Sequence, residues 1–251
     1  MPSHGSALHK TRLDVALVQR QLVESRERAQ ALILAGKVTV DGQRADKPGR
    51  TVDLGTQIEV QQPLKYVSRG GLKLEAALQA FGVSVEDKIC LDVGTSTGGF
   101  TDCLLQHGAK RVHAVDTGAG QISWKLRTDP RVVLHENVNA RYLTFDQIGE
   151  LAEVIACDVS FISVTLLVPA LAELLSSDGT WIILVKPQFE VGRNLVGKGG
   201  IVRDAGAQQM ACDQVARALE ARQFVPRYIE SPIFGAEGNR EFLMEARRTR
   251  S

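Results

Sequence analysis

Seven strand-like segments between residues 88 and 246 constrain this fold more than any other feature of the sequence. Strands that alternate with helical patterns are typical of a mostly parallel sheet covered on both faces. The last two segments are close enough in sequence to pair antiparallel. We therefore predict an α/β fold with a mostly parallel seven-stranded sheet. The segments are 88–93, 111–115, 132–135, 154–157, 180–185, 224–230 and 241–246, and the helical patterns are 73–81, from about 100, 164–175 and 207–222.

The first 60 residues carry a different pattern, in which two helices precede short strands. Ser25 is a suitable N-cap for the second helix, and Gly36 is a suitable stop for it. A strand-like segment at 37–40 runs into the hairpin signal Asp41-Gly42, and a last short strand follows at 57–60. We predict a small α+β domain over 8–62, a linker over 63–67 and the α/β domain over 68–251.

Composition excludes several classes of protein. With 44% hydrophobic and 24% charged residues, the 251-residue chain has the composition of a globular protein. No apolar run approaches the roughly 18 to 20 residues that cross a bilayer, and Met1–Lys10 lacks the apolar core of a signal peptide. The four cysteines form no CxxC pair and the five histidines are scattered, so we expect neither a metal site nor disulfides. A cytoplasmic protein with no membrane partner fits these features.

A glycine-rich turn, DVGTSTGGF over residues 92–100, follows the first predicted strand of the α/β domain. Glycines let a backbone approach a ligand, and the N-terminus of the next helix offers free N–H groups. Asp116 ends the second strand, where its carboxylate can accept hydrogen bonds from ribose hydroxyls. Three other interpretations stay open: a purely structural turn, a dinucleotide site with a broken GxGxxG, and a G-x-S-x-G nucleophile elbow, although no histidine follows His135.

Acidic residues at the ends of the first two strands favour S-adenosylmethionine as the ligand of this turn. The ammonium group and the ribose of that molecule both bind carboxylates, and it carries no pyrophosphate. A second glycine-rich segment, 192–198, has the spacing of a P-loop, but Gly199 replaces the required Ser or Thr, so we predict a loop beside the site. The predicted cofactor-binding residues are Asp92, Gly94, Ser96, Gly98, Gly99, Phe100, Asp116 and Asn137.

Four charged residues are predicted to meet at one edge of the sheet. Asp158 and Lys186 each follow the C-terminal end of an apolar strand, the edge where open α/β sheets bind ligands. Glu241 begins a strand of opposite direction, so it lies at the same edge, and Lys73 comes from the helix before the first strand. Either strand-end charge alone could simply be a solvated terminus, but four charges of alternating sign favour a site.

These motifs identify a resemblance. Residues from about Ser68 onward resemble the FtsJ-like ribose 2′-O-methyltransferases, which carry a Lys-Asp-Lys-Glu tetrad. The matching motifs are SRGGLKLEAAL with Lys73, CDVSFIS with Asp158, VKPQFE with Lys186 and GNREFL with Glu241. Residues 12–60 resemble the S-four-type RNA-binding domain through RLD, GKVTVDG and KPG. Together they resemble the TlyA family of rRNA cytidine 2′-O-methyltransferases, with GTSTGG where that family has GASTGG.

The resemblance implies a Rossmann-like class I methyltransferase that uses S-adenosylmethionine and needs no metal. Its substrates would be cytidines of 16S and/or 23S ribosomal RNA, in ribosomal subunits. A ribose hydroxyl is a poor nucleophile, and a lysine can take its proton only when desolvation or a like charge favours the neutral amine. We expect Lys186 to be this base and Lys73 to position the hydroxyl, although these roles could be exchanged. Asp158 and Glu241 would orient the two ammonium groups.

The small domain would then dock folded RNA. Residues 1–67 hold ten lysines and arginines against seven acids, and basic side chains contact phosphates without reading sequence. Two alternatives stay open: a non-catalytic RNA-binding assembly factor, and a haemolysin-like membrane-active protein. The oligomeric state is open. The predicted RNA-binding residues are Arg12, Arg26, Arg28, Lys37, Arg44, Lys47 and Arg69.

Overall fold

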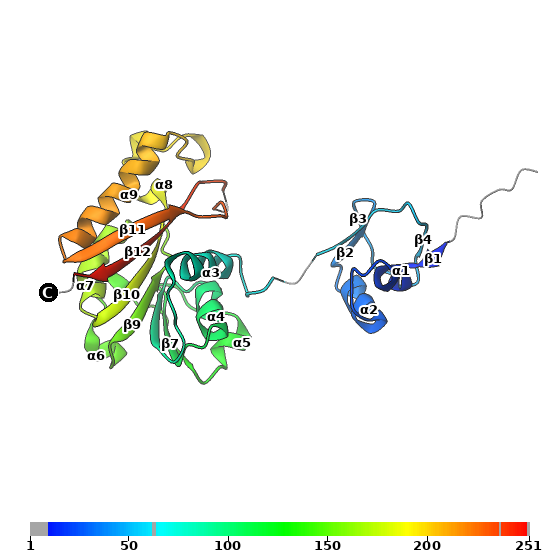
Figure 1. Cartoon of the computed structure of the whole chain (residues 1–251), viewed down its shortest axis with the longest axis horizontal. Helices are drawn as coiled ribbons and strands as arrows, with labels where there is room; N and C mark the ends of the chain where they lie inside the picture. The colour runs from blue at the N-terminus through cyan, green and yellow to red at the C-terminus, as the bar shows by residue number, and fades with distance from the viewer. Residues whose placement is uncertain (1–9, 62–63, 236, 250–251) are drawn as a thin grey trace, which may run out of the picture. The chain divides into compact units, whose positions relative to one another are not determined.

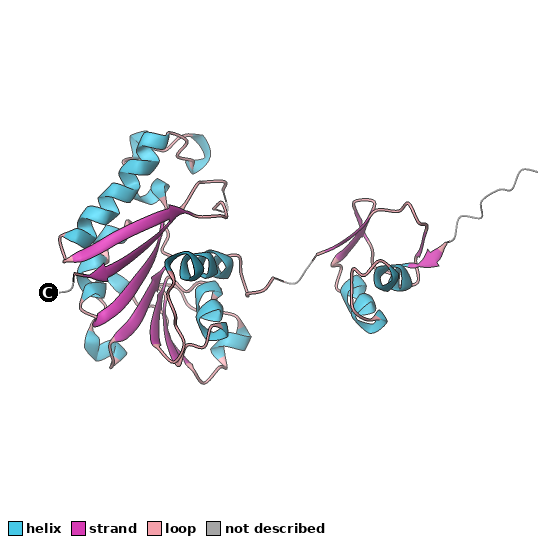
Figure 2. Ribbon diagram, viewed as in Figure 1, coloured by secondary structure: helices cyan, strands magenta, loops and turns pink. Residues whose placement is uncertain are grey.

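The computed structural model describes residues 10–61, 64–235 and 237–249 and contains two compact units, 1–63 and 64–251. Figures 1 and 2 show their helices and strands. Two of our predictions concern residues that the structure does not describe. We expected no signal peptide in Met1–Lys10, of which only Lys10 is described. We also placed the domain–linker junction at residues 62–63, which lie outside the described residues.

The small unit packs two helices against short strands. Ser25 caps the second helix as predicted, because its Oγ accepts a hydrogen bond from the backbone N of Arg28 at 3.2 Å. Asp41 and Gly42 both have positive φ and close the predicted hairpin. The sequence did not reveal a two-residue pairing between the first and fourth strands. The elements are β1 (Thr11–Arg12), α1 (Leu13–Gln19), α2 (Arg26–Leu34), β2 (Val38–Val40), β3 (Gln43–Arg44), β4 (Thr51–Val52) and β5 (Ile58–Val60).

The large unit is built on one seven-stranded sheet, as predicted. Its strand order is β11-β12-β10-β9-β6-β7-β8. Neighbouring strands are parallel except where β12 pairs antiparallel with β10 and β11. The strands are β6 (Ile89–Val93), β7 (Arg111–Val115), β8 (Val132–His135), β9 (Ala152–Cys157), β10 (Leu175–Val185), β11 (Phe224–Glu230) and β12 (Phe242–Arg248).

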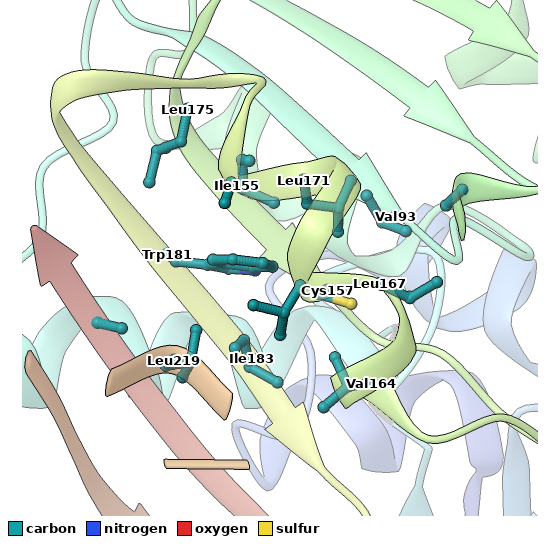
Figure 3. Packing of buried hydrophobic residues seen from close by; sticks show 14 of the residues in the cluster. Val93, Ile155, Cys157, Val164, Leu167, Leu171, Leu175, Trp181, Ile183 and Leu219 are labelled. Atoms are coloured by element: carbon teal, nitrogen blue, oxygen red, sulfur yellow. The ribbon is translucent and has the colours of Figure 1, made fainter. Parts of the chain in front are cut away.

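Helices cover both faces of this sheet because side chains alternate along its central strands. In β9, Val154 and Ala156 face one hydrophobic core, and Ile155 and Cys157 face the other. The first core contains α3 (Gly70–Phe81), α4 (Gly99–Gln106) and α5 (Trp124–Arg127), and the second contains α6 (Phe145–Ile148), α7 (Val168–Ala172) and α9 (Ala205–Glu220). Figure 3 shows the second core, where Trp181 lies among aliphatic side chains.

The helix predicted over 164–175 is shorter than expected. A 3₁₀ turn, η2 (Val164–Leu166), precedes α7, which ends at Ala172. The following strand already begins at Leu175 and has an irregular register before Thr180. Pro169 lies in the first turn of α7, where its missing N–H costs no helix hydrogen bond, and the polar residues 176–179 of β10 lie where its pairing with β9 is irregular. The remaining elements are η1 (Ala140–Tyr142), α8 (Pro187–Glu190), η3 (Arg193–Leu195) and η4 (Lys198–Gly200), all too short to give a periodic pattern.

Candidate active site

The parallel strands bring their C-terminal ends to one edge of the sheet. Gly94, Asp116 and Asp158 directly follow β6, β7 and β9, and Lys186 directly follows β10. Because β12 runs in the opposite direction and pairs Phe242 with Val185, its start lies at the same edge. The topology therefore gathers the charged residues that the sequence placed at strand ends.

The glycine turn between β6 and α4 packs against the end of β9. Gly94 has a φ of +85°, and a Cβ added there would lie 2.4 Å from the backbone oxygen of Asp158. A side chain at this position would therefore push the turn away from the neighbouring strand. Gly98 has a φ of +97° at the N-cap of α4, where a Cβ would lie 2.3 Å from Leu126. The turn has its shape because these two positions lack side chains.

Asp116 fixes the turn from the next strand. Its Oδ2 accepts a hydrogen bond from the backbone N of Ser96, and its Oδ1 accepts one from the N of Gly118, both at 2.7 Å. The same carboxylate lines a cavity of about 420 Å³, within the range of small-ligand sites. Gly94, Ser96, Asn139 and Asp158 contribute to its wall beside apolar side chains such as Ile162 and Leu167. We call this the cofactor cavity.

Asp92 lies behind the turn and lines neither this cavity nor the next. Burial raises the pKa of its carboxyl to about 7, although a hydrogen bond from Thr101 partly opposes this shift. Thr101 Oγ1 donates to Oδ2 at 2.6 Å, whereas Oδ1 is buried with no hydrogen-bond partner. Asp92 therefore keeps a proton to near neutral pH and contacts Thr101 of α4 instead of facing either cavity.

The four predicted catalytic residues form two ion pairs. Lys186 Nζ lies 2.6 Å from Asp158 Oδ1 and donates a hydrogen bond to Ser160 Oγ at 2.8 Å. Lys73 Nζ, from α3, pairs with Glu241 Oε2 at the start of β12. All four side chains line a second cavity of about 320 Å³, together with Arg69. We call this the catalytic cavity.

The cofactor and catalytic cavities adjoin each other. Gly94, Ser96, Asp158 and Ser160 line both of them. A ligand in the first cavity can therefore present an atom to a group held in the second. Each lysine Nζ lies beside one carboxylate, Lys186 beside Asp158 and Lys73 beside Glu241. The orienting role of Asp158 and Glu241 stays a prediction.

Only some of the other predicted cofactor residues line a cavity. Gly99 and Phe100 line the catalytic cavity, whereas Gly98 belongs to the turn behind it. Asn137 is exposed and lines neither cavity, but Asn139 lines the cofactor cavity. Sequence reasoning missed Ser160, whose signal was its position two residues after the strand-end acid.

The basic residues of the small unit form two groups. Asp14 is fully buried and accepts hydrogen bonds from Arg12, Arg26 and Gln30. The hydrogen bond from Arg12, helped by the other two donors, holds the pKa of the Asp14 carboxyl well below its usual range. The predicted RNA-binding residues outside this network are exposed: Arg28, Lys37, Arg44 and Lys47.

Two features of the described residues bear on the alternative functions. No helix there is long and apolar enough to span a membrane. No group of three or more His, Cys, Asp or Glu side chains within residues 10–61, 64–235 and 237–249 could hold a metal ion. The P-loop-like segment 192–198 does not follow the first strand of the sheet, and it contains η3 rather than a phosphate-binding helix start.

Comparison with protein-family models assigns both units. The FtsJ-like methyltransferase model matches residues 66–248, and the S4 domain model matches residues 11–58. This chain belongs to the FtsJ-like methyltransferase family. The match confirms the predicted methyltransferase fold and the predicted S4 domain of the small unit.

Individual relatives of this FtsJ-like methyltransferase contain both units. This chain is 50% identical over 238 residues to YqxC of Bacillus subtilis, and the match covers 94% of this chain and 85% of YqxC. It is 44% identical over 238 residues to the 16S/23S rRNA (cytidine-2′-O)-methyltransferase TlyA of Mycobacterium tuberculosis, covering 94% and 89%. A solved Streptococcus thermophilus structure named as a hemolysin has a TM-score of 0.74 at 46% identity, covering 98% and 90%. The expected resemblance to the TlyA family is therefore confirmed.

Membership in this family implies S-adenosylmethionine as cofactor, and the residues present fit it. The carboxylates of Asp116 and Asp158 suit its ribose and its positive charges, and the apolar walls suit its adenine. At Gly94, a Cβ would close the space between turn and strand that the backbone needs. When bound, this cofactor supplies an electrophilic methyl group on a sulfonium.

Proposed function

We propose that this chain methylates the ribose 2′-hydroxyl of a cytidine in 16S ribosomal RNA, 23S ribosomal RNA or both, in the cytoplasm. The name of the TlyA relative supports this substrate, and the S4 domain supports an RNA partner. Another relative is named as a hemolysin. Among the described residues of this chain, however, no helix is long and apolar enough to span a membrane. Ribosomal RNA or a ribosomal subunit is therefore the partner that we assign.

One observation carries the proposal: Lys186 is held at a cavity that shares a wall with the cofactor cavity. Methyl transfer is an in-line displacement, so the attacking oxygen and the methyl carbon must meet across a short gap. Asp158 and Ser160 are among the residues that line both cavities. A ribose hydroxyl beside Lys186 Nζ would therefore lie next to the methyl group of S-adenosylmethionine.

The four charged residues would have separate roles. In its neutral amine form, Lys186 takes the proton from the 2′-hydroxyl as the oxygen attacks the methyl carbon, and Asp158 and Ser160 orient its Nζ. Lys73, fixed by Glu241, holds the developing alkoxide in place with its positive charge. Arg69 is exposed at the rim of the catalytic cavity, where it can hold a phosphate beside the reacting ribose.

The small unit would supply affinity for RNA. Arg12 and Arg26 are held in fixed positions by Asp14 while their side chains stay 50% and 55% exposed. The exposed residues Arg28, Lys37 and Lys47 add positive charge on the same unit. Contacts of this kind bind phosphates in any sequence, so the choice of nucleotide would depend on other parts of the complex.

A transfer assay separates this function from its alternatives. The full chain is incubated with labelled S-adenosylmethionine and with ribosomal subunits from cells that lack the protein, and 2′-O-methyl positions are mapped. We expect at least one newly methylated cytidine with the wild-type chain and none with Lys186→Ala. Calorimetry should show that Lys186→Ala still binds the cofactor. Cofactor binding without transfer to any ribosomal RNA would instead favour a non-catalytic assembly factor.

A further inference from the structure

A third cavity, of about 380 Å³, adjoins the catalytic cavity at Lys186 and shares Ser160 and Phe161 with the cofactor cavity. Ser160, Lys186 and Glu241 line both this cavity and the catalytic cavity. In a nucleotide, the base is attached to C1′, which is bonded to the C2′ that carries the reacting hydroxyl. A ribose in the catalytic cavity must therefore place its base in an adjoining space. Because the cofactor takes one neighbour, this third cavity is the space left for the base.

The walls of this third cavity are tied together. Asn239, which is 1% exposed, accepts a hydrogen bond from the backbone N of Val202 and donates one to the carbonyl of Gly200, both at 2.9 Å. It thereby joins the β11–β12 connection to residues 200–202, which directly follow the glycine-rich segment 192–198. Val196 of segment 192–198 and Gly200, just after that segment, line the cavity. The segment therefore acts as a fixed wall of this space.

The cavity contains the chemistry needed to hold a base. Phe161 and Phe189 line it with ring centroids 5.3 Å apart, and aromatic rings suit stacking on a planar base. Phe161 is 92% exposed and has a positive φ of 66°, which is unusual for so large a side chain. These features favour an aromatic ligand in the third cavity.

Gln188 and Glu237 give the cavity hydrogen-bond acceptors beside the donor Lys186. Gln188 Oε1 is buried without a hydrogen-bond partner, and an unsatisfied buried acceptor is stabilised by an incoming donor. The carboxylate of Glu237 also lines the cavity. Cytosine offers an exocyclic amino group at the position where uracil has a carbonyl oxygen. A carboxylate accepts from that amino group and repels that carbonyl.

We infer that Gln188 and Glu237 select the target base and favour cytosine over uracil. Gln188 accepts from the exocyclic amine and can donate from its own amide to the ring nitrogen. The side-chain amide of a glutamine alone could flip and bind uracil equally well. Glu237 therefore decides the selection, because its carboxylate can only accept hydrogen bonds. This inference rests on the proposed function and assigns specificity to residues outside the tetrad.

The test compares two substrates that differ only at the target base. Ribosomal subunits carrying cytidine or uridine at the mapped position are methylated by the wild-type chain, Glu237→Gln and Gln188→Leu. We expect the wild-type chain to prefer cytidine. Glu237→Gln should lower the cytidine-to-uridine ratio of kcat/KM about 10-fold, because its amide can donate to the uracil oxygen. Gln188→Leu should lower kcat/KM on cytidine about 10-fold with unchanged cofactor affinity.

Matched controls separate selection from general damage. Glu220→Gln and Gln79→Leu make the same chemical changes at exposed positions on α9 and α3, and their ratios should equal that of the wild-type chain. Glu237 is exposed, so its variant tests the inference even if Gln188→Leu fails to fold. A Glu237→Gln ratio equal to that of Glu220→Gln would overturn the inference. So would a wild-type chain that methylates both substrates equally, whereas transfer to neither would contradict the proposed function itself.

Discussion

The two units each contain a cluster of opposite charges, but they expose opposite parts of it. In the small unit, one carboxylate, Asp14, is fully buried, while the arginines that bind it are 50% and 55% exposed. In the large unit, the cations themselves are enclosed: Lys73 and Lys186 are only 10% and 11% exposed. The same types of ion pair therefore present charge to solvent in one place and to a cavity in the other.

In the proposed function, this difference would separate RNA binding by the small unit from methyl transfer by the large unit. Exposed guanidinium groups on a fixed carboxylate can meet phosphates of a large partner, and that attraction needs no exact geometry. Enclosed ammonium groups beside a ligand cavity can act only on the few atoms that enter it, where electrostatic interactions are stronger than in water. The comparison predicts that mutations in the two clusters will have different effects.

The largest effect should follow loss of an enclosed lysine. Lys186→Met should lower the single-turnover rate of methyl transfer by about 10³-fold, and Lys73→Met by about 10²-fold, since proton removal typically contributes 10²–10⁴-fold. Lys186 is the lysine that lines both the catalytic cavity and the cavity beyond it. Rapid-quench assays at saturating cofactor measure these rates. A greater loss with Lys73→Met would reverse the two roles.

Loss of the buried acid should act on folding rather than on chemistry. Asp14→Asn weakens charge-assisted hydrogen bonds to Arg12 and Arg26, so it should lower the free energy of unfolding of the small unit by about 2 kcal/mol. Hydrogen exchange of the small-unit amides measures this, because both tryptophans, Trp124 and Trp181, belong to the large unit. Asp46→Asn, at an exposed position, is the control. Equal protection in the two variants would contradict a structural role for Asp14.

The two buried aspartates should give the units opposite responses to pH. The pKa of Asp14 is held low in the folded state, so its contribution to stability is present above the unfolded pKa of about 4 and is lost as pH falls below it. Burial raises the pKa of Asp92 to about 7, so the folded large unit binds the extra proton between about pH 4 and 7. Its unfolding free energy should fall as pH rises through that range.

Denaturant unfolding followed by tryptophan fluorescence at several pH values measures the second response. Asp92→Asn cannot titrate, so it should remove the downward slope and leave the large unit relatively more stable at pH 7 to 8. If the variant and the wild-type chain show the same slope, Asp92 does not hold its proton as we describe.

The smallest effect should come from a single exposed lysine of the small unit. Lys47→Ala should weaken binding to ribosomal RNA slightly and lower the slope of log Kd against log salt concentration by about 1. Lys110→Ala is a matched control, because Lys110 precedes β7 at the edge of the sheet opposite the cavities. Equal salt slopes for the two variants would remove Lys47 from the RNA-binding surface.

The sequence predicted where the site lies because sheet topology depends on patterns that are visible in it. Alternating strands and helices place the C-terminal strand ends at one edge, so Asp116, Asp158 and Lys186 could be placed together without coordinates. It also predicted the cap at Ser25, which depends only on neighbouring residues. These features follow from local periodicity and from the direction of strands.

Features that depend on side-chain packing could not be predicted in this way. The pairing of Lys73 with Glu241 joins residues far apart in sequence, and nothing local specifies which acid each lysine meets. Asp14 interrupts an otherwise apolar helix face beside Leu13 and Leu17, a signal that indicates a buried acid but not its partners. Whether Asn137 or Asn139 lines the cofactor cavity depends on the path of the loop after β8, which has no periodic pattern.

The chemical position of the transferred methyl group tests the central claim most directly. Ribosomal RNA methylated by the wild-type chain is digested to nucleosides and analysed by mass spectrometry against authentic standards. Two lysines that line a cavity adjoining the cofactor cavity predict 2′-O-methylcytidine as the new nucleoside. A methyl group on a ring carbon or an exocyclic nitrogen of the base would contradict this account of the site.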